Sequence, residues 1–144
     1  MTNDLQRIVQ QRLNSIKTEY GIQEISYRIG SDKQMFPHIV FDFTSITPTD
    51  MGRLDFLLDI DIWARDQFVA FQIMDAVRDL FVFWNAPDVY TNQDILPTFY
   101  EMSGGSVDDQ DKDLVHLVLR LEGQTYKTGA TDSGILAGPT VGTN

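Results

Sequence analysis

The stretch LDFLLDIDIW, residues 54–63, decides the fold because apolar side chains occupy every second position along it. Successive side chains of an extended strand point to opposite sides, so this alternation gives the strand one apolar face. That face consists of Leu54, Phe56, Leu58, Ile60 and Ile62. The opposite face carries Asp55, Leu57, Asp59, Asp61 and Trp63. We therefore predict a strand with one face in the core and one wet, acidic face.

Two amphipathic helices are predicted on either side of this strand. Asp66 is expected to cap a helix that runs to about Asn85 and stops before Pro87, with Val69, Ile73, Val77, Leu80, Phe81 and Trp84 as its apolar stripe. At the start of the chain, apolar residues recur at helical spacing before Gly21 and predict a helix of about four turns. These residues are Leu5, Ile8, Val9, Leu13 and Ile16.

Further strands are predicted at residues 25–29, 36–43, 95–102 and 114–124, with loops at 44–52 and 104–112. Runs of adjacent strands with only two helices indicate an α+β fold, in which both helices pack on one face of a mostly antiparallel sheet. The expected domain covers residues 1–126. Residues 127–144 hold four Gly, four Thr and few large apolar side chains, so we expect a flexible tail.

The composition narrows the range of possible functions. Twenty-one acidic and 11 basic residues give a formal net charge of −10, opposite in sign to that of most proteins that grip phosphates. Fifteen of the acids lie beyond residue 50. The absence of cysteine excludes disulfides and thiolate metal sites. No apolar run is long enough to predict a signal peptide or a membrane span.

Asp59 and Asp61 allow two interpretations. Two carboxylates on one strand face are typical of Mg²⁺-dependent nucleases, so a nuclease or phosphodiesterase using this pair is the alternative function. However, alternating acids also form the solvent face of many half-buried strands, and no lysine lies nearby to complete a nuclease site. We therefore favour the second interpretation and predict no catalytic, cofactor or metal-binding residues.

Other chemistry-bearing residues fit no known motif. The acids Asp108, Asp109, Asp111 and Asp113 resemble the start of a calcium loop, but Leu114 and Arg120 stand where that loop needs Gly and Glu. His38 and His116 each fall opposite the apolar positions of a predicted strand, and neither accompanies a nucleophile motif. We expect an acidic, solvated loop and two ordinary strand histidines.

Aromatic side chains outside the predicted core form a further group. Trp63 lies on the acidic strand face, and Phe68, Phe71 and Phe83 fall off the stripe of the second helix. Because small monomers rarely leave large apolar patches open, these four residues are candidates for a subunit interface. Burial within a second face of the core is an equally good explanation.

The order of these signals resembles the tail terminator proteins of long-tailed phages, also called tail completion or tail-to-head joining proteins. The resemblance rests on the N-terminal helix, FPHIVF (36–41), LDFLLDIDIWAR (54–65), the helix start at 68–74 and LVHLVLRLEG (114–123). It covers about residues 3–126 and depends on order and hydrophobic pattern rather than on an invariant motif.

This resemblance implies a structural, non-enzymatic virion protein of the tail and neck, assembled in the host cytoplasm. The subunits would form a hexameric ring that caps the tail tube protein and meets a head-completion protein, while DNA passes through the centre. An acidic lumen would repel that DNA. The candidate lumen or ring-surface acids are Asp55, Asp59, Asp61, Asp108, Asp109, Asp111 and Asp113.

Overall fold

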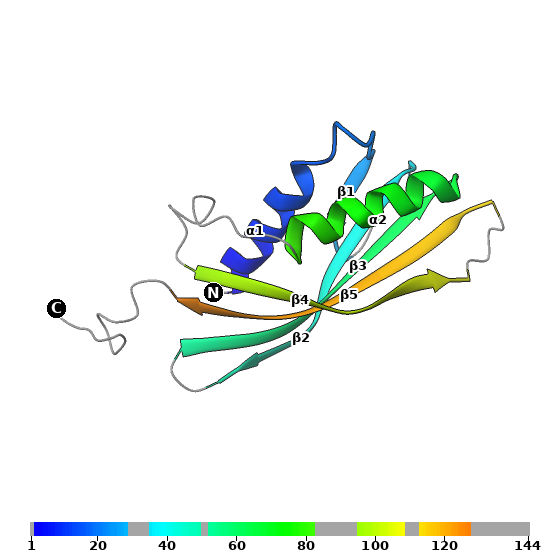
Figure 1. Ribbon diagram of the computed structural model, residues 1–144. Helices are drawn as coiled ribbons and strands as arrows, with labels where there is room; N and C mark the ends of the chain where they lie inside the picture. The colour runs from blue at the N-terminus through cyan, green and yellow to red at the C-terminus, as the bar shows by residue number, and fades with distance from the viewer. Residues whose placement is uncertain (1, 29–34, 50–51, 83–94, 109–112, 128–144) are drawn as a thin grey trace.

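The computed structural model describes residues 2–28, 35–49, 52–82, 95–108 and 113–127. Within them the order of elements is α1 (Thr2–Asn14), β1 (Glu24–Tyr27), β2 (His38–Pro48), β3 (Arg53–Ala64), α2 (Gln67–Phe81), β4 (Ile95–Val107) and β5 (Val115–Lys127). The strands form one sheet in the order β1-β2-β3-β5-β4, and both helices lie on the same face of it (Figure 1). The predicted α+β class is confirmed.

The sheet is mostly antiparallel, as its sequence pattern predicts. β2, β3, β5 and β4 each run opposite to their neighbours, whereas β1 pairs with β2 in the parallel direction. β3 lies at the centre and pairs with β2 on one side and with β5 on the other over nearly its whole length. The strand with the clearest alternation is therefore also the one that the other strands surround.

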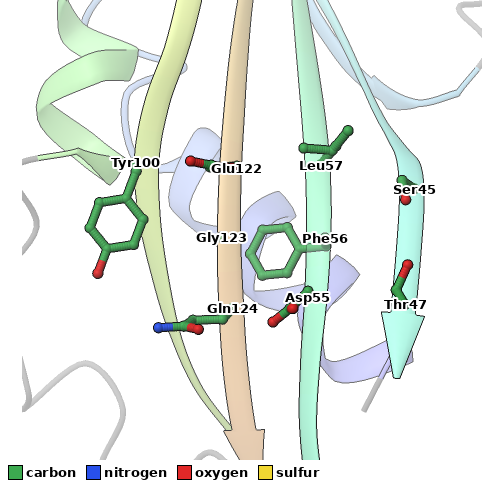
Figure 2. A pocket seen from close by; sticks show the side chains of 9 residues that line it. All are labelled: Ser45, Thr47, Asp55, Phe56, Leu57, Tyr100, Glu122, Gly123 and Gln124. Atoms are coloured by element: carbon green, nitrogen blue, oxygen red, sulfur yellow. The ribbon is translucent and has the colours of Figure 1, made fainter. Parts of the chain in front are cut away.

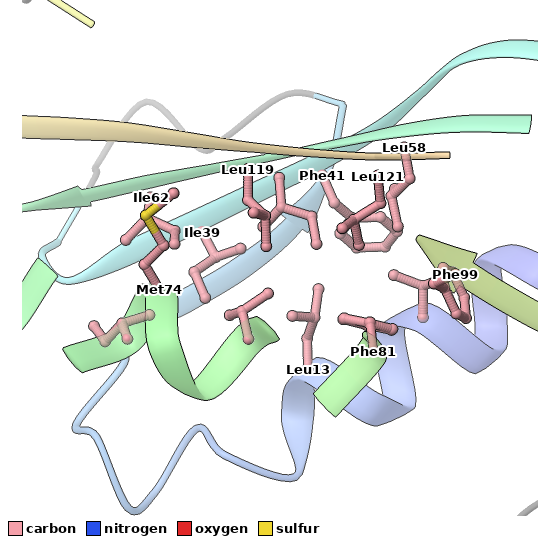
Figure 3. Close-up of a cluster of buried hydrophobic side chains, with 14 of the residues drawn as sticks. Leu13, Ile39, Phe41, Leu58, Ile62, Met74, Phe81, Phe99, Leu119 and Leu121 are labelled. Atoms are coloured by element: carbon pink, nitrogen blue, oxygen red, sulfur yellow. The ribbon is translucent and has the colours of Figure 1, made fainter. Parts of the chain in front are cut away.

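The core fills the space between the sheet and the two helices. All five apolar residues of β3 are at most 5% exposed, and they meet Ile39, Phe41 and Phe43 of β2 and Leu117, Leu119 and Leu121 of β5 (Figure 3). From the helix side come Leu13 and the α2 residues Ile73, Met74 and Phe81. Asp66 caps α2 as predicted, because its carboxylate accepts a 2.8 Å hydrogen bond from the Phe68 amide.

The loops predicted at 44–52 and 104–112 are wrong in part, because β2 and β4 extend into them. β2 continues through Ser45 to Pro48, which pairs with Leu54 after a register shift between Phe43 and Ser45. β4 continues to Val107, opposite His116, after a shift between Glu101 and Ser103. Main-chain pairing needs no alternation of side chains, and each register shift interrupts the alternation that the sequence would show.

Other boundaries differ by a few residues. α2 ends at Phe81 with Val82 as its C-cap, so the remainder of the predicted helix, to Asn85, lies outside the described residues. β1 stops at Tyr27, where Arg28 adopts φ 72°, a conformation that ends a regular strand. β5 includes Lys127, and the predicted tail beyond it also lies outside the described residues.

Candidate functional site

The sheet face opposite the helices carries most of the polar side chains of the central strands, and we call it the polar face. Asp55, Asp59, Asp61 and Trp63 of β3 point to it because they alternate with the core residues. The three acids that the sequence places on one face therefore do lie together. They are not free carboxylates, however, because the structure gives each of them a basic partner.

Asp59 and Arg120 form the best-aligned ion pair on the polar face. They are direct cross-strand neighbours, and the Arg120 Nε and Nη2 atoms donate to the two Asp59 oxygens at 2.7 and 3.0 Å. This fork-like pairing is the geometry that an arginine and a carboxylate prefer, and it raises the pKa of Arg120 above its ordinary value. Asp59 is thus held in one orientation by a residue from another strand.

Asp55 and Asp61 have partners of their own. The Arg53 Nε lies 3.0 Å from Asp55 Oδ1, two residues away on the same strand. His116 Nε2 lies 2.7 Å from Asp61 Oδ1, between β5 and β3. Burial raises the pKa of Asp61, and the hydrogen bond with His116 opposes that rise. The face consequently has less free negative charge than the sequence suggests.

The two histidines of the chain flank Trp63 in one row across the sheet. His38 of β2 and His116 of β5 both pair directly with Trp63. The His116 ring stacks on the indole at 4.2 Å between centroids, and His38 meets it edge-on at 5.8 Å. Trp63 is half-buried in this row, and its place at a subunit interface stays a prediction.

His38 is fully buried, although it is a polar residue on the polar face. Its Nδ1 lies 3.3 Å from Glu24 Oε1, close enough for attraction, but neither ring nitrogen has an aligned hydrogen bond within the described residues. Burial lowers the pKa of His38 below its ordinary value of 6.5, and the Glu24 carboxylate partly offsets this. The folded protein therefore favours the neutral ring.

This burial predicts a pH dependence of stability. An unfolded chain protonates His38 near pH 6.5, whereas the folded chain resists protonation until lower pH, so the unfolded state binds more protons in that window. We expect the free energy of unfolding to fall from about pH 7.5 to about pH 5.5, and the fall to be smaller in His38→Gln. Urea titrations at both pH values measure this slope. Identical slopes in the two proteins would show that His38 does not carry the effect.

The ion pairs also bear on the nuclease alternative. A metal bound by Asp59 and Asp61 would have to displace Arg120 from one carboxylate and His116 from the other. Within the described residues, no group of three or more His, Cys, Asp or Glu side chains is arranged to hold a metal ion. The geometry of these two acids fits electrostatic pairing within the sheet better than metal binding.

An Asp59→Asn substitution tests this assignment. We expect no Mg²⁺-dependent cleavage of DNA or RNA by either the wild-type protein or the variant, and a small fall in thermal midpoint because Arg120 loses its ionic partner. Arg120→Gln should produce a similar small fall, and the double variant should lose little more, since both changes remove the same interaction. Cleavage by the wild type that disappears in Asp59→Asn would restore the nuclease hypothesis.

A shallow hollow of about 320 Å³ opens among β2, β3, β5 and β4 (Figure 2). Hydrogen-bonding side chains make up most of its lining: Ser45, Thr47, Asp55, Tyr100, Glu122 and Gln124. Small-molecule sites are usually deeper and more apolar. The hollow therefore offers hydrogen-bond partners to another protein surface rather than an enclosed site for a substrate.

The remaining candidates are spread over other parts of the molecule. Phe68 and Phe71 are 67% and 44% exposed on the outer side of α2, so they stay candidates for an interface, while Phe83 lies outside the described residues. Asp108 and Asp113 are exposed beside the β4–β5 connection, and the other two loop acids, Asp109 and Asp111, also fall outside the description.

Sequence reasoning missed the exposed residues of β4. Tyr100, Met102 and Val107 are 54%, 50% and 44% exposed, whereas the sequence pattern predicts an ordinary strand for the first two and a loop for the third. Their exposure depends on the position of β4 at the edge of the sheet, and edge position has no local signal in this stretch. In the described part of the chain, no helix has the length and apolarity needed to cross a membrane.

Comparison with known proteins gives a likeness of fold. No protein-family model matches the chain, and no curated protein matches its sequence. Among solved structures, the fold is similar to a chain from the virion of a native gene transfer agent particle, with a TM-score of 0.55 and 10% sequence identity. The match covers 82% of this chain and 91% of the other. At this identity, the likeness establishes the shared fold and nothing finer.

Proposed function

We propose that this protein is a structural subunit of a phage-like virion, and more specifically a tail terminator. In that role it assembles as a ring on the last ring of tail tube protein, stops growth of the tube and joins it to the head-completion proteins. DNA passes through the centre of the ring without being bound. The observation that carries the proposal is the shared fold with a chain of a gene transfer agent virion, over most of both chains.

Three features of the sequence and structure support this role. The order of elements and the hydrophobic pattern resemble those of tail terminator proteins. Asp55, Asp59 and Asp61 each pair with a basic side chain of the same chain, as expected of acids that stabilise a sheet. In addition, exposed aromatic side chains on α2 offer apolar surface for contacts between subunits or rings.

We further propose that the polar face lines the channel of the ring. It carries Asp55, Asp59 and Asp61 together with Glu122, and the paired basic groups fix the first three in position. These four acids outnumber the two arginines of the face, Arg53 and Arg120, so a modest excess of negative charge is left to repel a phosphate backbone, while the paired cations limit repulsion among the subunits. Such a surface suits a channel through which DNA has to slide without binding.

Depletion of the protein during virion assembly tests the role. We expect overlong tails that lack heads, because a missing terminator leaves tube growth unchecked, and we expect a plasmid copy of the gene to restore normal tails. Electron microscopy of the lysate measures tail length directly. Full heads that leak DNA beside tails of normal length would instead identify a head-closure protein, and unchanged virions would exclude a role in the neck.

A further inference from the structure

The outer part of β4, residues 100–107, lies at one edge of the sheet and is exposed, although Met74 and Arg78 of α2 approach it at Gly104. All eight residues from Tyr100 to Val107 are exposed, although they pair with β5 on one side. β4 is the last strand of the sheet, and within the described residues no strand pairs with its outer side (Figure 1). The main chain of an edge strand presents free N–H and C=O groups, which can template pairing with another strand.

This edge has only part of the usual protection. Proteins blunt exposed edges with short strands, charges, bulges or proline. β4 has one register shift, between Glu101 and Ser103, but it is 13 residues long and Pro97 lies outside the exposed segment. Its one charged residue, Glu101, accepts hydrogen bonds from Arg78 Nε at 3.0 and 3.2 Å, so that charge is neutralised within the chain. An edge of this length, with Tyr100, Met102 and Val107 exposed and its one charge paired, is available to a partner strand.

We infer that the partner is a second copy of this chain, which pairs its own sheet edge with residues 100–107 of β4. The chain has a net charge of −10, so two copies repel each other over most of their surfaces. Repulsion is least where free charge is lowest, and residues 100–107 carry one charged side chain, Glu101, which is paired with Arg78, although Asp108 follows directly. This inference rests on the proposed ring, since it names the surface through which the ring closes.

The receiving edge is β1, at the opposite end of the same sheet, which is four residues long and so can pair with about half of residues 100–107. A closed ring needs a heterologous contact, in which one surface of a subunit meets a different surface of the next. β1 runs parallel to β2, and each following neighbour reverses direction, so β1 and β4 point in opposite directions. Copies that share one orientation therefore bring β4 against β1 of the next copy as an antiparallel pair.

A charge-addition variant tests the edge. Met102→Glu with Ser106→Glu adds two carboxylates to exposed positions of β4, and Gln11→Glu with Gln72→Glu adds the same charge at exposed positions on the helices. We expect the first variant to need at least about tenfold more protein to reach half-assembly, because its new charges face an acidic copy, and the control to stay close to wild type. Sedimentation velocity across a concentration series measures both.

Hydrogen exchange of the wild-type protein supplies a second readout that needs no variant. Amides in residues 100–107 and in β1 should both gain protection when the protein assembles. If the protein assembles without that protection, or if the β4 variant assembles as readily as the control, the strand pairing is wrong and the ring proposal stands. A dimer in which β4 alone gains protection would contradict the pairing of β4 with β1. A chain that stays monomeric even beside tail tube protein overturns both.

Discussion

A Phe41→Ala variant is expected to lose about 3–5 kcal/mol of unfolding free energy, because it removes the largest fully buried side chain near the centre of the sheet. The Phe41 ring is 0% exposed and packs against Tyr27 and Phe43, with ring centroids 5.2 and 6.5 Å away. The surrounding β-sheet restricts collapse into the cavity that alanine would leave. Domains of this size have about 5–15 kcal/mol of stability in total, so the loss is a large share of it.

Urea unfolding at a concentration where the protein is monomeric measures this loss. Phe68→Ala is the matched control, since the same truncation is made at a side chain that is 67% exposed. We expect the control to change stability by less than about 0.5 kcal/mol. Equal losses in the two variants would mean that the packing described here around Phe41 is incorrect.

The second large effect is expected at Gly123, which has no room for a side chain. A Cβ atom there would lie 2.3 Å from the Thr98 carbonyl oxygen and 2.5 Å from the Phe56 ring. The carbonyl belongs to the neighbouring strand, so it moves only if β4 and β5 separate locally. We expect Gly123→Ala to cost at least about 1–3 kcal/mol, the usual range for overpacking a filled core.

Gly105 provides the control for that substitution. It lies on β4, and a Cβ atom built on it meets no other atom within 4 Å. Gly105→Ala should therefore leave the thermal midpoint nearly unchanged, whereas Gly123→Ala should lower it clearly. If the two alanine variants melt together, the close contact between β5 and Phe56 does not exist in solution.

The fold was predictable where alternation is strong and uninterrupted. β3 and both helices follow from their apolar spacing, because burial on one face leaves a period that a single sequence displays. The last residues of β2 and β4 were not predictable as strand, because a register shift interrupts the alternation in each strand and polar residues follow the shift. The parallel pairing of β1 with β2 is likewise set by tertiary structure and not by local pattern.

The candidate site was predictable only in part. Alternation placed Asp55, Asp59 and Asp61 on one face, and the structure agrees. Their partners were not predictable, because Arg120 reaches Asp59 across 61 positions of sequence and only the register of β3 with β5 brings them together. The registers of β3 with β2 and with β5 likewise make His38 and His116 neighbours of Trp63, an arrangement for which the sequence carries no signal.

Native mass spectrometry of the purified protein with tail tube protein shows whether this chain works as a ring on the tail tube. We expect a closed assembly whose mass is a whole multiple of the 16.4 kDa chain, six by the resemblance to tail terminators, with ring-shaped particles in negative stain. A strictly monomeric species at every concentration, with tail tube protein present, would contradict it.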